Sequence, residues 1–454
     1  MMTLTLAYLA VCSVAPFQTY PLDTAANVWD VAVKDITGDG KADIFLLCCD
    51  EKSYPLVKFL AVHVADEAGA YCSQPTFRLD LQPTVSGVFF AEVDGAAPVE
   101  LVAVDAQGAT IFRYQENFAQ SESIRFASLF PSGSKEPLFL RDTATDLDGD
   151  GIDEWLVPIA SGYEIRRGAS SLAQVSCNVV SEMRPGDNIV ITHRLPSCHP
   201  FNLEGQPDKA LAFLSDEFAD FAYGARWGQT KRYKIPVNLE EKWEASTKME
   251  DIDGNGLPDL IVTQTRGTIN LESRTHVYMA SAPFVYPDAP SATFSAQGSV
   301  AGATVKDVDG DQKEDVVFIS IPFGAKNILN FFTRRKLSAK AEVYLFRNGG
   351  FESKPSFVES FSLDAPEGRE RVAYTLGDFN GDGRMDAAFG AGSDALEIHT
   401  GSEDRLISAK PWVTVNVPPF GMARPHNLNG NQAEDIIIHH PGGKNAKRVD
   451  VVVF

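Results

Sequence analysis

The chain of 454 residues contains no apolar run long enough to span a bilayer beyond its first 16 positions. Because a membrane helix needs about 18 or more consecutive apolar residues, we expect no membrane span. Basic residues are also scarce, since 40 Lys and Arg stand against 61 Asp and Glu and leave a net charge of −21. A surface this acidic repels phosphate backbones and anionic lipid heads, so we expect no nucleic-acid partner.

Cysteine is scarce as well, with six residues in the whole chain and no spacing typical of a zinc site. Five of them lie beyond residue 15, and an odd number leaves at least one thiol unpaired. Cys48 and Cys49 are adjacent on an expected strand and point to opposite faces, so at most one of them can easily reach Cys72. Cys177 and Cys198 could close a loop. The sequence leaves the pairing open.

The common catalytic motifs HExxH, GxSxG, the Walker loop and GxGxxG are all missing. No convergent set of Lys, Arg, Tyr or His stands out as an acid–base pair either. These absences favour a protein that binds over one that catalyses.

Residues 1–15 form an apolar run that ends in the small residues Ser13-Val14-Ala15, which is typical of an export signal. No Lys or Arg precedes the run, and Pro16 would follow the cut. Leu9-Ala10-Val11-Cys12 also resembles a bacterial lipid-attachment box, although Val11 stands where a small residue is usual. An ordinary N-terminal strand is the third interpretation. We expect a signal peptide over 1–15 and a secreted, periplasmic or cell-surface protein.

What the sequence does contain is a recurring nine-residue pattern with oxygen-bearing side chains at places one, three, five and nine. Internal repeats of this kind define an architecture before any single element does. Five clear copies occur: DITGDGKAD at 35–43, DLDGDGIDE at 146–154, DIDGNGLPD at 251–259, DVDGDQKED at 307–315 and DFNGDGRMD at 378–386.

Three weaker copies fill the gaps between the clear ones. They read EVDGAAPVE at 92–100, NLEGQPDKA at 202–210 and NLNGNQAED at 427–435. With them, successive copies start between 49 and 71 residues apart, whereas two gaps would otherwise be about twice as long. We therefore count eight repeats, with seven as the fallback.

Each repeat has room for four short strands. An apolar run such as Ile44-Phe45-Leu46-Leu47 follows the motif, two alternating strands come next, and a fourth such as 28–33 precedes the following motif. Four strands in about 50 residues are typical of a propeller blade. We expect an all-β fold, a single β-propeller over 16–454 with eight four-stranded blades, and a monomeric ring. The strand at 17–22 should complete the last blade and close the ring.

The motif chemistry favours calcium, because Ca²⁺ takes six to eight oxygen ligands and an Asp-rich turn supplies them at low steric cost. Gly at places four and six lets the backbone turn. The loop is not an EF-hand, because apolar residues stand at the twelfth place where that loop has Glu. The alternative is an ordinary Asp/Asn/Gly turn without metal.

The pattern Dx[DNT]xDGxxD between two strands, repeated at propeller spacing, resembles the FG-GAP or VCBS repeats of integrin α-chain-type propellers. In that family, side chains at places one, three, five and nine and the carbonyl at seven hold calcium in the turn between the first two strands of a blade. The resemblance implies about five structural Ca²⁺ sites. The candidate ligands are Asp35, Thr37, Asp39, Asp43, Asp146, Asp148, Asp150, Glu154, Asp251, Asp253, Asn255, Asp259, Asp307, Asp309, Asp311, Asp315, Asp378, Asn380, Asp382 and Asp386.

Some copies depart from the family pattern. Thr37 replaces a carboxylate or amide, Glu154 is longer than the usual Asp, and Gln312 stands where Gly normally turns the chain. These three sites should be weaker or distorted. The copy at 427–435 has Asn at three of its four ligand places, so we expect a hydrogen-bonded turn without metal there.

The longest interval between motifs places extra residues at 322–340, which we interpret as a long loop on the face opposite the calcium turns. Aromatic and Arg residues are typical of binding hot spots. The alternative is that the aromatic residues pack the loop onto its own blade. The candidate partner-binding residues are Phe331, Phe332, Arg334, Arg335 and Lys336.

The sequence thus predicts an exported, calcium-stabilised propeller that acts as an adhesion or interaction module for an extracellular protein or glycan. The enzymatic alternative is a calcium-dependent carbohydrate-active enzyme such as a polysaccharide lyase, because large propellers of similar make-up include such enzymes.

Overall fold

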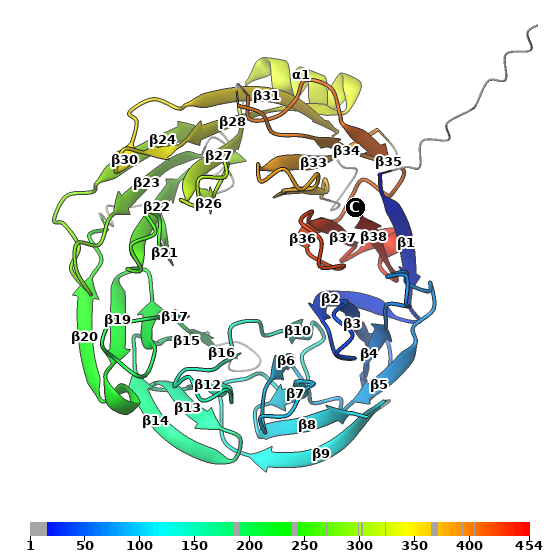
Figure 1. Ribbon diagram of the computed structural model, residues 1–454, viewed down its shortest axis with the longest axis vertical. Helices are drawn as coiled ribbons and strands as arrows, with labels where there is room; N and C mark the ends of the chain where they lie inside the picture. Colours follow the sequence, from blue (N-terminus) through cyan, green and yellow to red (C-terminus); the bar gives the residue numbers. More distant parts are fainter. Residues whose placement is uncertain are drawn as a thin grey trace, which may run out of the picture.

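In the computed structural model, β-sheets follow one another around a central opening (Figure 1). The structure describes residues 16–454 except 116, 185–189, 238–242, 268–270, 298, 301–302, 323, 365–370, 393 and 404. Within these residues, eight antiparallel sheets form the blades, one for each copy of the motif. This confirms the predicted eight-bladed β-propeller. The signal peptide expected over 1–15 lies outside the described residues.

Blades 1 to 4 each place their first strand near the central opening and their fourth at the rim (Figure 1). Blade 1 contains β2 (Asn27–Lys34), β3 (Asp43–Asp50), β4 (Val57–His63) and β5 (Phe77–Leu81). Blade 2 contains β6 (Gly87–Ala91), β7 (Glu100–Asp105), β8 (Gly108–Tyr114) and β9 (Phe118–Arg125), with β10 (Leu138–Phe139) parallel to β6. Blade 3 contains β11 (Ala144–Thr145), β12 (Glu154–Ile159), β13 (Gly162–Arg167) and β14 (Ser170–Ser176). Blade 4 contains β17 (Ser197–Phe201), β18 (Ala210–Leu214), β19 (Phe218–Tyr223) and β20 (Gln229–Lys234).

Blades 5 to 8 continue the ring in the same order. Blade 5 contains β21 (Glu244–Glu250), β22 (Asp259–Arg266), β23 (Glu272–Tyr278) and β24 (Ala292–Gln297). Blade 6 contains β25 (Ser299–Val300) and β26 (Thr304–Lys306) as its inner strand, then β27 (Asp315–Ile321), β28 (Lys336–Tyr344) and β31 (Phe357–Asp364). Blade 7 contains β32 (Tyr374–Gly377), β33 (Asp386–Ala391), β34 (Ala395–His399) and β35 (Val413–Val415). Blade 8 contains β36 (Met422–His426), β37 (Asp435–His439), β38 (Arg448–Val453) and β1 (Gln18–Asp23).

The strand that follows each motif is apolar because both of its faces are covered by neighbouring blades. In β3, Ile44 and Leu46 belong to the core that blade 1 shares with blade 8, where they meet Ile437. Phe45 and Leu47 point to the other face and join the core shared with blade 2. Adjacent strand residues point to opposite faces, so a continuous apolar run fits a strand buried on both sides.

The N-terminal strand closes the ring, as predicted. β1 pairs antiparallel with β38 from Gln18 opposite Val453 to Asp23 opposite Arg448. Leu22 is fully buried between blades 8 and 1. The two ends of the described chain therefore lie in one sheet.

All eight motifs connect the first strand of a blade to its second strand. Because neighbouring strands are antiparallel, these turns lie on one face of the ring, and the turns between second and third strands lie on the opposite face. We call these the motif face and the opposite face. The candidate cation sites therefore share one side of the molecule.

The segment expected as a long loop at 322–340 is instead a helix followed by a strand, which corrects the prediction. α1 (Ala325–Arg334) runs between β27 and β28 of blade 6, and β28 already begins at Lys336. The helix therefore belongs to the opposite face and lies at the outer rim (Figure 1).

Short elements complete the structure: the hairpins β15 (Val180–Arg184) with β16 (Val190–Arg194) and β29 (Phe346–Arg347) with β30 (Gly350–Phe351), and the 3₁₀ turns η1 (Ala225–Trp227) and η2 (Gly443–Asn445). Among the described residues, no helix is long and apolar enough to cross a membrane. The five described cysteines are all free thiols, so neither possible pairing forms in this part of the chain.

Candidate metal centres

The first Asp of each clear motif organises the turn through backbone hydrogen bonds. In blade 1, Gly38 N–H donates to Asp35 Oδ1 at 2.7 Å and Gly40 N–H donates to Asp35 Oδ2 at 2.8 Å. Both glycines have positive φ, at 74° and 83°, which only Gly adopts without strain. Blade 6 keeps the same bonds although Gln312 stands at place six with φ 65°. The predicted turn at this place is therefore kept, at a cost in backbone strain.

The carboxylate at place nine ties three segments together. Asp43 is fully buried, and it accepts N–H groups from Ile36 at 3.0 Å and from Ala65 at 3.2 Å. Ile36 belongs to the motif turn, and Ala65 follows the third strand of the blade. The equivalent pair of backbone bonds recurs at Asp259, Asp315, Asp386 and Asp435.

Burial gives these place-nine carboxyls unusual acidities. Loss of solvation, together with the nearby Asp253 and Asp251 charges, raises the pKa of Asp259 to about 6, although two backbone hydrogen bonds lower it. The same causes raise the pKa of Asp315 to about 7 and that of Asp386 to about 6. The carboxylates repel one another in this partly desolvated turn, and a bound cation would relieve that repulsion.

Blades 5 and 6 present the carboxylates that best fit a divalent cation. One oxygen each of Asp251, Asp253 and Asp259 lie within 4.8 Å of one another. In blade 6, oxygens of Asp307, Asp309 and Asp311 meet the same criterion. Asp309 Oδ2 accepts a hydrogen bond from Arg347 Nη2 at 2.7 Å, whereas the buried Asp309 Oδ1 has no hydrogen-bond partner, which a cation would supply. These residues would hold the ion, and a Ca²⁺ there would link the motif turn to the strand that follows.

Blades 1 and 7 have a neutral side chain at place three. Thr37 Oγ1 lies 3.4 Å from Asp35 Oδ1, and Asn380 Nδ2 donates to Asp382 Oδ2 at 2.9 Å. Both loops keep oxygen donors at all four ligand places, but each has three carboxylates where blade 6 has four. They fit a cation with a smaller electrostatic attraction than blade 6.

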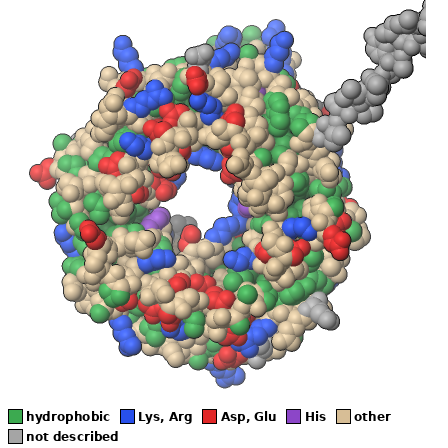
Figure 2. All heavy atoms as spheres, viewed as in Figure 1, with side chains coloured by type: hydrophobic (Ala, Val, Ile, Leu, Met, Phe, Trp, Pro, Cys, Tyr) green, Lys and Arg blue, Asp and Glu red, His purple; other side chains and the backbone are tan. Residues whose placement is uncertain are grey.

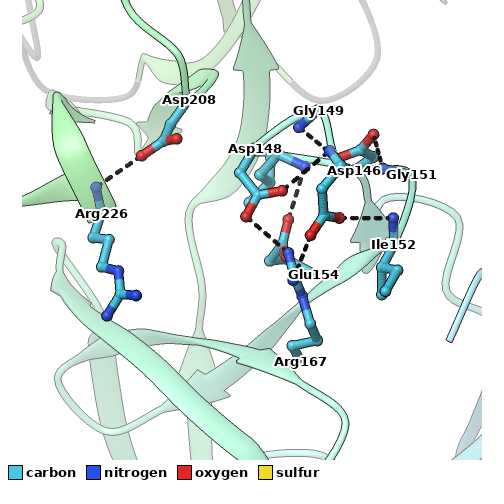
Figure 3. A network of polar contacts seen from close by, with 11 residues as sticks. Asp146, Asp148, Gly149, Gly151, Ile152, Glu154, Arg167, Asp208 and Arg226 are labelled. Atoms are coloured by element: carbon cyan, nitrogen blue, oxygen red, sulfur yellow. Dashed lines mark hydrogen bonds and ion pairs between the residues drawn. The ribbon is translucent and has the colours of Figure 1, made fainter. Parts of the chain in front are cut away.

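Blade 3 contains a positive charge that the sequence analysis missed. The guanidinium of Arg167 contacts three of the four predicted ligands, with Nη1 to Asp150 Oδ2 at 2.6 Å, Nη2 to Asp148 Oδ2 at 2.8 Å and Nε to Glu154 Oε1 at 2.8 Å (Figure 3). Arg167 is the last residue of β13. The carboxylates therefore converge as predicted, but around a side chain of the same blade.

Blade 2 repeats this arrangement at a motif that the sequence shows as degenerate. Oxygens of Glu92, Asp94 and Glu100 lie within 4.8 Å of one another. Arg113 Nε contacts Glu100 Oε1 at 3.0 Å, and its Nη2 contacts Asp94 Oδ2 at 2.8 Å.

The remaining two motifs lack the acidic set. In blade 8, Asn429 Nδ2 and Asn431 Nδ2 donate to the Phe454 carbonyl at 3.1 and 2.9 Å, a hydrogen-bonded turn of the kind predicted for 427–435. In blade 4, the buried Ala210 stands at place nine, and Asp208 accepts the Arg226 N–H at 2.8 Å (Figure 3).

The residues predicted to bind a partner all lie in or next to α1. Phe331, Phe332 and Arg334 are in the helix, Arg335 ends it with a left-handed conformation, and Lys336 starts β28. Phe331 packs against Phe332 at 5.3 Å between ring centroids, and Arg335 lies 5.6 Å from the Phe331 centroid. The aromatic pair thus packs within the helix.

A basic cleft on the opposite face was not expected from the sequence. Arg371, His440, Lys444 and Arg448 line a cavity of about 940 Å³ between blades 7 and 8, which Asp394 also lines and where Arg448 pairs with Asp450. The buried His440 Nε2 lies 3.0 Å from Asp450 Oδ2. The four residues come from two parts of the chain about 70 residues apart, Arg371 and the segment 440–448, so no local pattern indicates them.

Comparison with known proteins identifies no family for this chain. No protein-family model and no curated protein matches this chain. Among solved structures it is similar to BBS1N in complex with ARL6DN, with 9% identity, a TM-score of 0.38, and coverage of 96% of this chain and 95% of that one. It is also similar to the Photorhabdus luminescens Tc holotoxin pore, with 11% identity, a TM-score of 0.30, and coverage of 96% of this chain and 23% of that one. At this level of similarity neither indicates a function for this chain.

Proposed function

We propose that this protein is an FG-GAP-type, calcium-stabilised propeller that serves as an interaction module and binds a protein partner through α1. The calcium part is supported by the oxygen clusters in blades 5 and 6 and by the orphaned Asp309 Oδ1. The interaction part is supported by the surface of α1.

The observation that carries the binding proposal is the exposed apolar side of α1. Ile328, Leu329 and Phe332 are 40%, 61% and 73% exposed. They stand at i, i+1 and i+4, so one side of the helix presents all three. Monomeric proteins seldom leave large apolar side chains exposed together, and such groups mark binding surfaces.

The helix is attached to its blade by a polar contact, which leaves the apolar side free. Asn327 is buried, its Nδ2 donates to the Pro322 and Ser338 carbonyls at 2.8 and 3.0 Å, and its Oδ1 accepts the Ser338 N–H at 3.0 Å. Asn327 is the helical residue that the blade buries.

The chemistry of this surface defines the partner. Burying the aliphatic side chains of Ile328 and Leu329 against apolar groups would contribute favourable binding free energy. A protein groove provides such apolar groups, whereas a glycan provides fewer of them. Lys326, Arg334 and Arg335 flank the apolar residues on an otherwise acidic protein. We therefore propose a protein partner with an apolar groove rimmed by acidic residues.

The test compares wild type with the double variant Leu329→Ser/Phe332→Ser as bait in calcium, using extracellular and cell-surface proteins. Because both side chains are exposed, folding stability should change by no more than about 0.5 kcal/mol for each substitution. Val358→Ser on β31 is the matched control, since Val358 is 50% exposed on the same blade.

We expect one protein to be retained by wild type and by Val358→Ser and to be lost with the double variant. The purified partner should then bind Arg334→Glu/Arg335→Glu at least tenfold more weakly, and high salt should weaken its binding to wild type. Equal capture by wild type and the double variant would contradict the proposal. Retention of glycans in place of protein would also contradict it.

A further inference from the structure

The two blades with Glu at place nine share a second feature on their third strand. Arg113 follows Phe112, the pairing partner of Leu101, and so stands across from Glu100. Arg167 follows Arg166, the pairing partner of Trp155, and so stands across from Glu154. The equivalent residues of the five blades with Asp at place nine are uncharged: Val64, Met279, Leu345, Thr400 and Val453.

The longer side chain changes what the buried carboxylate binds. In the Asp blades, both oxygens accept backbone N–H groups, as Asp259 does from Ile252 at 3.0 Å and from Ala280 at 2.7 Å. Glu154 keeps the first of these bonds, from Leu147 N–H at 2.8 Å, but its other oxygen is bound by Arg167. The extra methylene thus replaces a backbone donor with a guanidinium.

The guanidinium then occupies the space that a metal ion would need. Arg167 contacts Asp148 and Asp150 as well as Glu154, whose side chain is fully buried (Figure 3). A planar guanidinium has five N–H donors that suit carboxylates, and it stays protonated in proteins. A divalent ion would have to displace it and then lie next to its charge.

We propose that Arg113 and Arg167 are built-in cations that close the motif turns of blades 2 and 3, so these two turns take no metal ion. The ring then contains three classes of the same turn. Guanidinium groups close the motif turns of blades 2 and 3, and amide N–H groups close that of blade 8. In blade 6, Arg347 Nη2 contacts Asp309 Oδ2 at 2.7 Å but leaves Asp309 Oδ1 without a hydrogen-bond partner. The Asp-rich turns of blades 5 and 6 depend on a divalent cation. The last statement rests on the proposed function.

The test counts calcium ions bound per chain by equilibrium dialysis, using matched substitutions at place three. Asp253→Asn would leave blade 5 with two carboxylates, fewer than the three that blades 1 and 7 keep, so it should lower the count by one. Asp148→Asn in blade 3 should leave the count unchanged. Loss of one ion with Asp148→Asn would overturn the inference even if calcium binding itself is confirmed.

The converse variant removes the built-in cation. Arg167→Gln should gain one bound ion, and calcium should raise its melting temperature by more than it raises that of wild type. Arg232→Gln is the control, because Arg232 also pairs with a buried carboxylate, Asp220 at 2.5 Å, in blade 4 where the motif lacks its acidic set. Its count should equal that of wild type.

The two proposals fail in different ways. If wild type binds no calcium, the calcium part of the proposed function is wrong, while a gain of one ion in Arg167→Gln still supports the built-in cation. If a folded Arg167→Gln gains none, the inference is wrong. If Arg167→Gln does not fold, the Asp148→Asn count decides.

Discussion

Asp435 shows the structural role of place nine in a turn without the other carboxylates. It is fully buried and accepts N–H groups from Leu428 at 2.8 Å and from Phe454 at 2.9 Å. Burial raises its pKa to about 6, although these two bonds lower it. A pKa above the unfolded value means that the folded state holds the proton more tightly. The resulting stability is complete below the unfolded pKa and is lost as pH rises through about 6.

This gives a pH-dependent prediction for Asp435→Asn, which cannot titrate. The stability advantage of wild type over the variant should fall by roughly 3 kcal/mol between about pH 3.5 and pH 7, from the difference between the folded pKa and the unfolded value of about 3.9. Urea unfolding in a chelator at both pH values measures it. An advantage that is constant or that grows with pH would contradict the assigned protonation.

Residue types and spacing predicted the motif turns well, because places one, three, five and nine are local in sequence. They did not predict Arg113 and Arg167, each 13 residues after its Glu partner and on a different strand. The signal was nevertheless present, since an Arg follows Glu at the same distance in both repeats. Recognising it requires the strand register, which places those residues opposite each other.

At the scale of elements, β1 determines whether the ring closes. Its six residues pair with β38, and Leu22 packs with Val28 and Val449 across the junction of blades 8 and 1. The sequence predicted this strand because blade 8 otherwise lacked its fourth strand. Closure removes an exposed sheet edge.

Leu22→Ala should therefore destabilise the protein by about 2–5 kcal/mol, the range for a buried Leu truncated to Ala. Thr19→Ala on the same strand is exposed and should change stability by no more than about 0.5 kcal/mol. Denaturant unfolding of the two variants makes the comparison. Similar stability for both would show that β1 does not contribute to the shared core.

The helix α1 is an element that the sequence patterns did not predict. Apolar residues at 328, 329, 331 and 332 have spacings of three and four, which are typical of a helix. Sequence spacing alone predicts a loop here, because this repeat is longer than the others and the extra residues fall between two expected strands. Its attachment through Asn327 involves residues on both sides of the helix and could not be inferred from periodicity.

At the scale of the whole molecule, the motif turns concentrate negative charge on one face. The protein has a net charge of −21, and Lys and Arg side chains are interspersed among acidic ones on the face in Figure 2. Each divalent cation would add two positive charges beside buried carboxylates. The opposite face contains α1 and the basic cleft, so the proposed calcium sites and the proposed binding surface are on separate sides of the ring.

The fold was predictable because each of the eight copies of the motif marks the turn between the first two strands of one blade. The cation preference of each blade was less predictable, because it depends on which donor reaches the turn in three dimensions. The calcium-dependent stability that we propose therefore rests on the acidic turns that no guanidinium closes, chiefly that of blade 5 and, although Arg347 contacts Asp309 there, that of blade 6.

The most direct test of the account is the melting temperature of the full protein with saturating calcium and with a chelator. Calcium at about 100 times its dissociation constant should stabilise each occupied site by roughly 2.7 kcal/mol, so the melting temperature should rise by several degrees and fall again when the ion is removed. Asp253→Asn should show a smaller rise. Identical melting temperatures in calcium and in chelator would contradict the central claim that calcium stabilises this propeller.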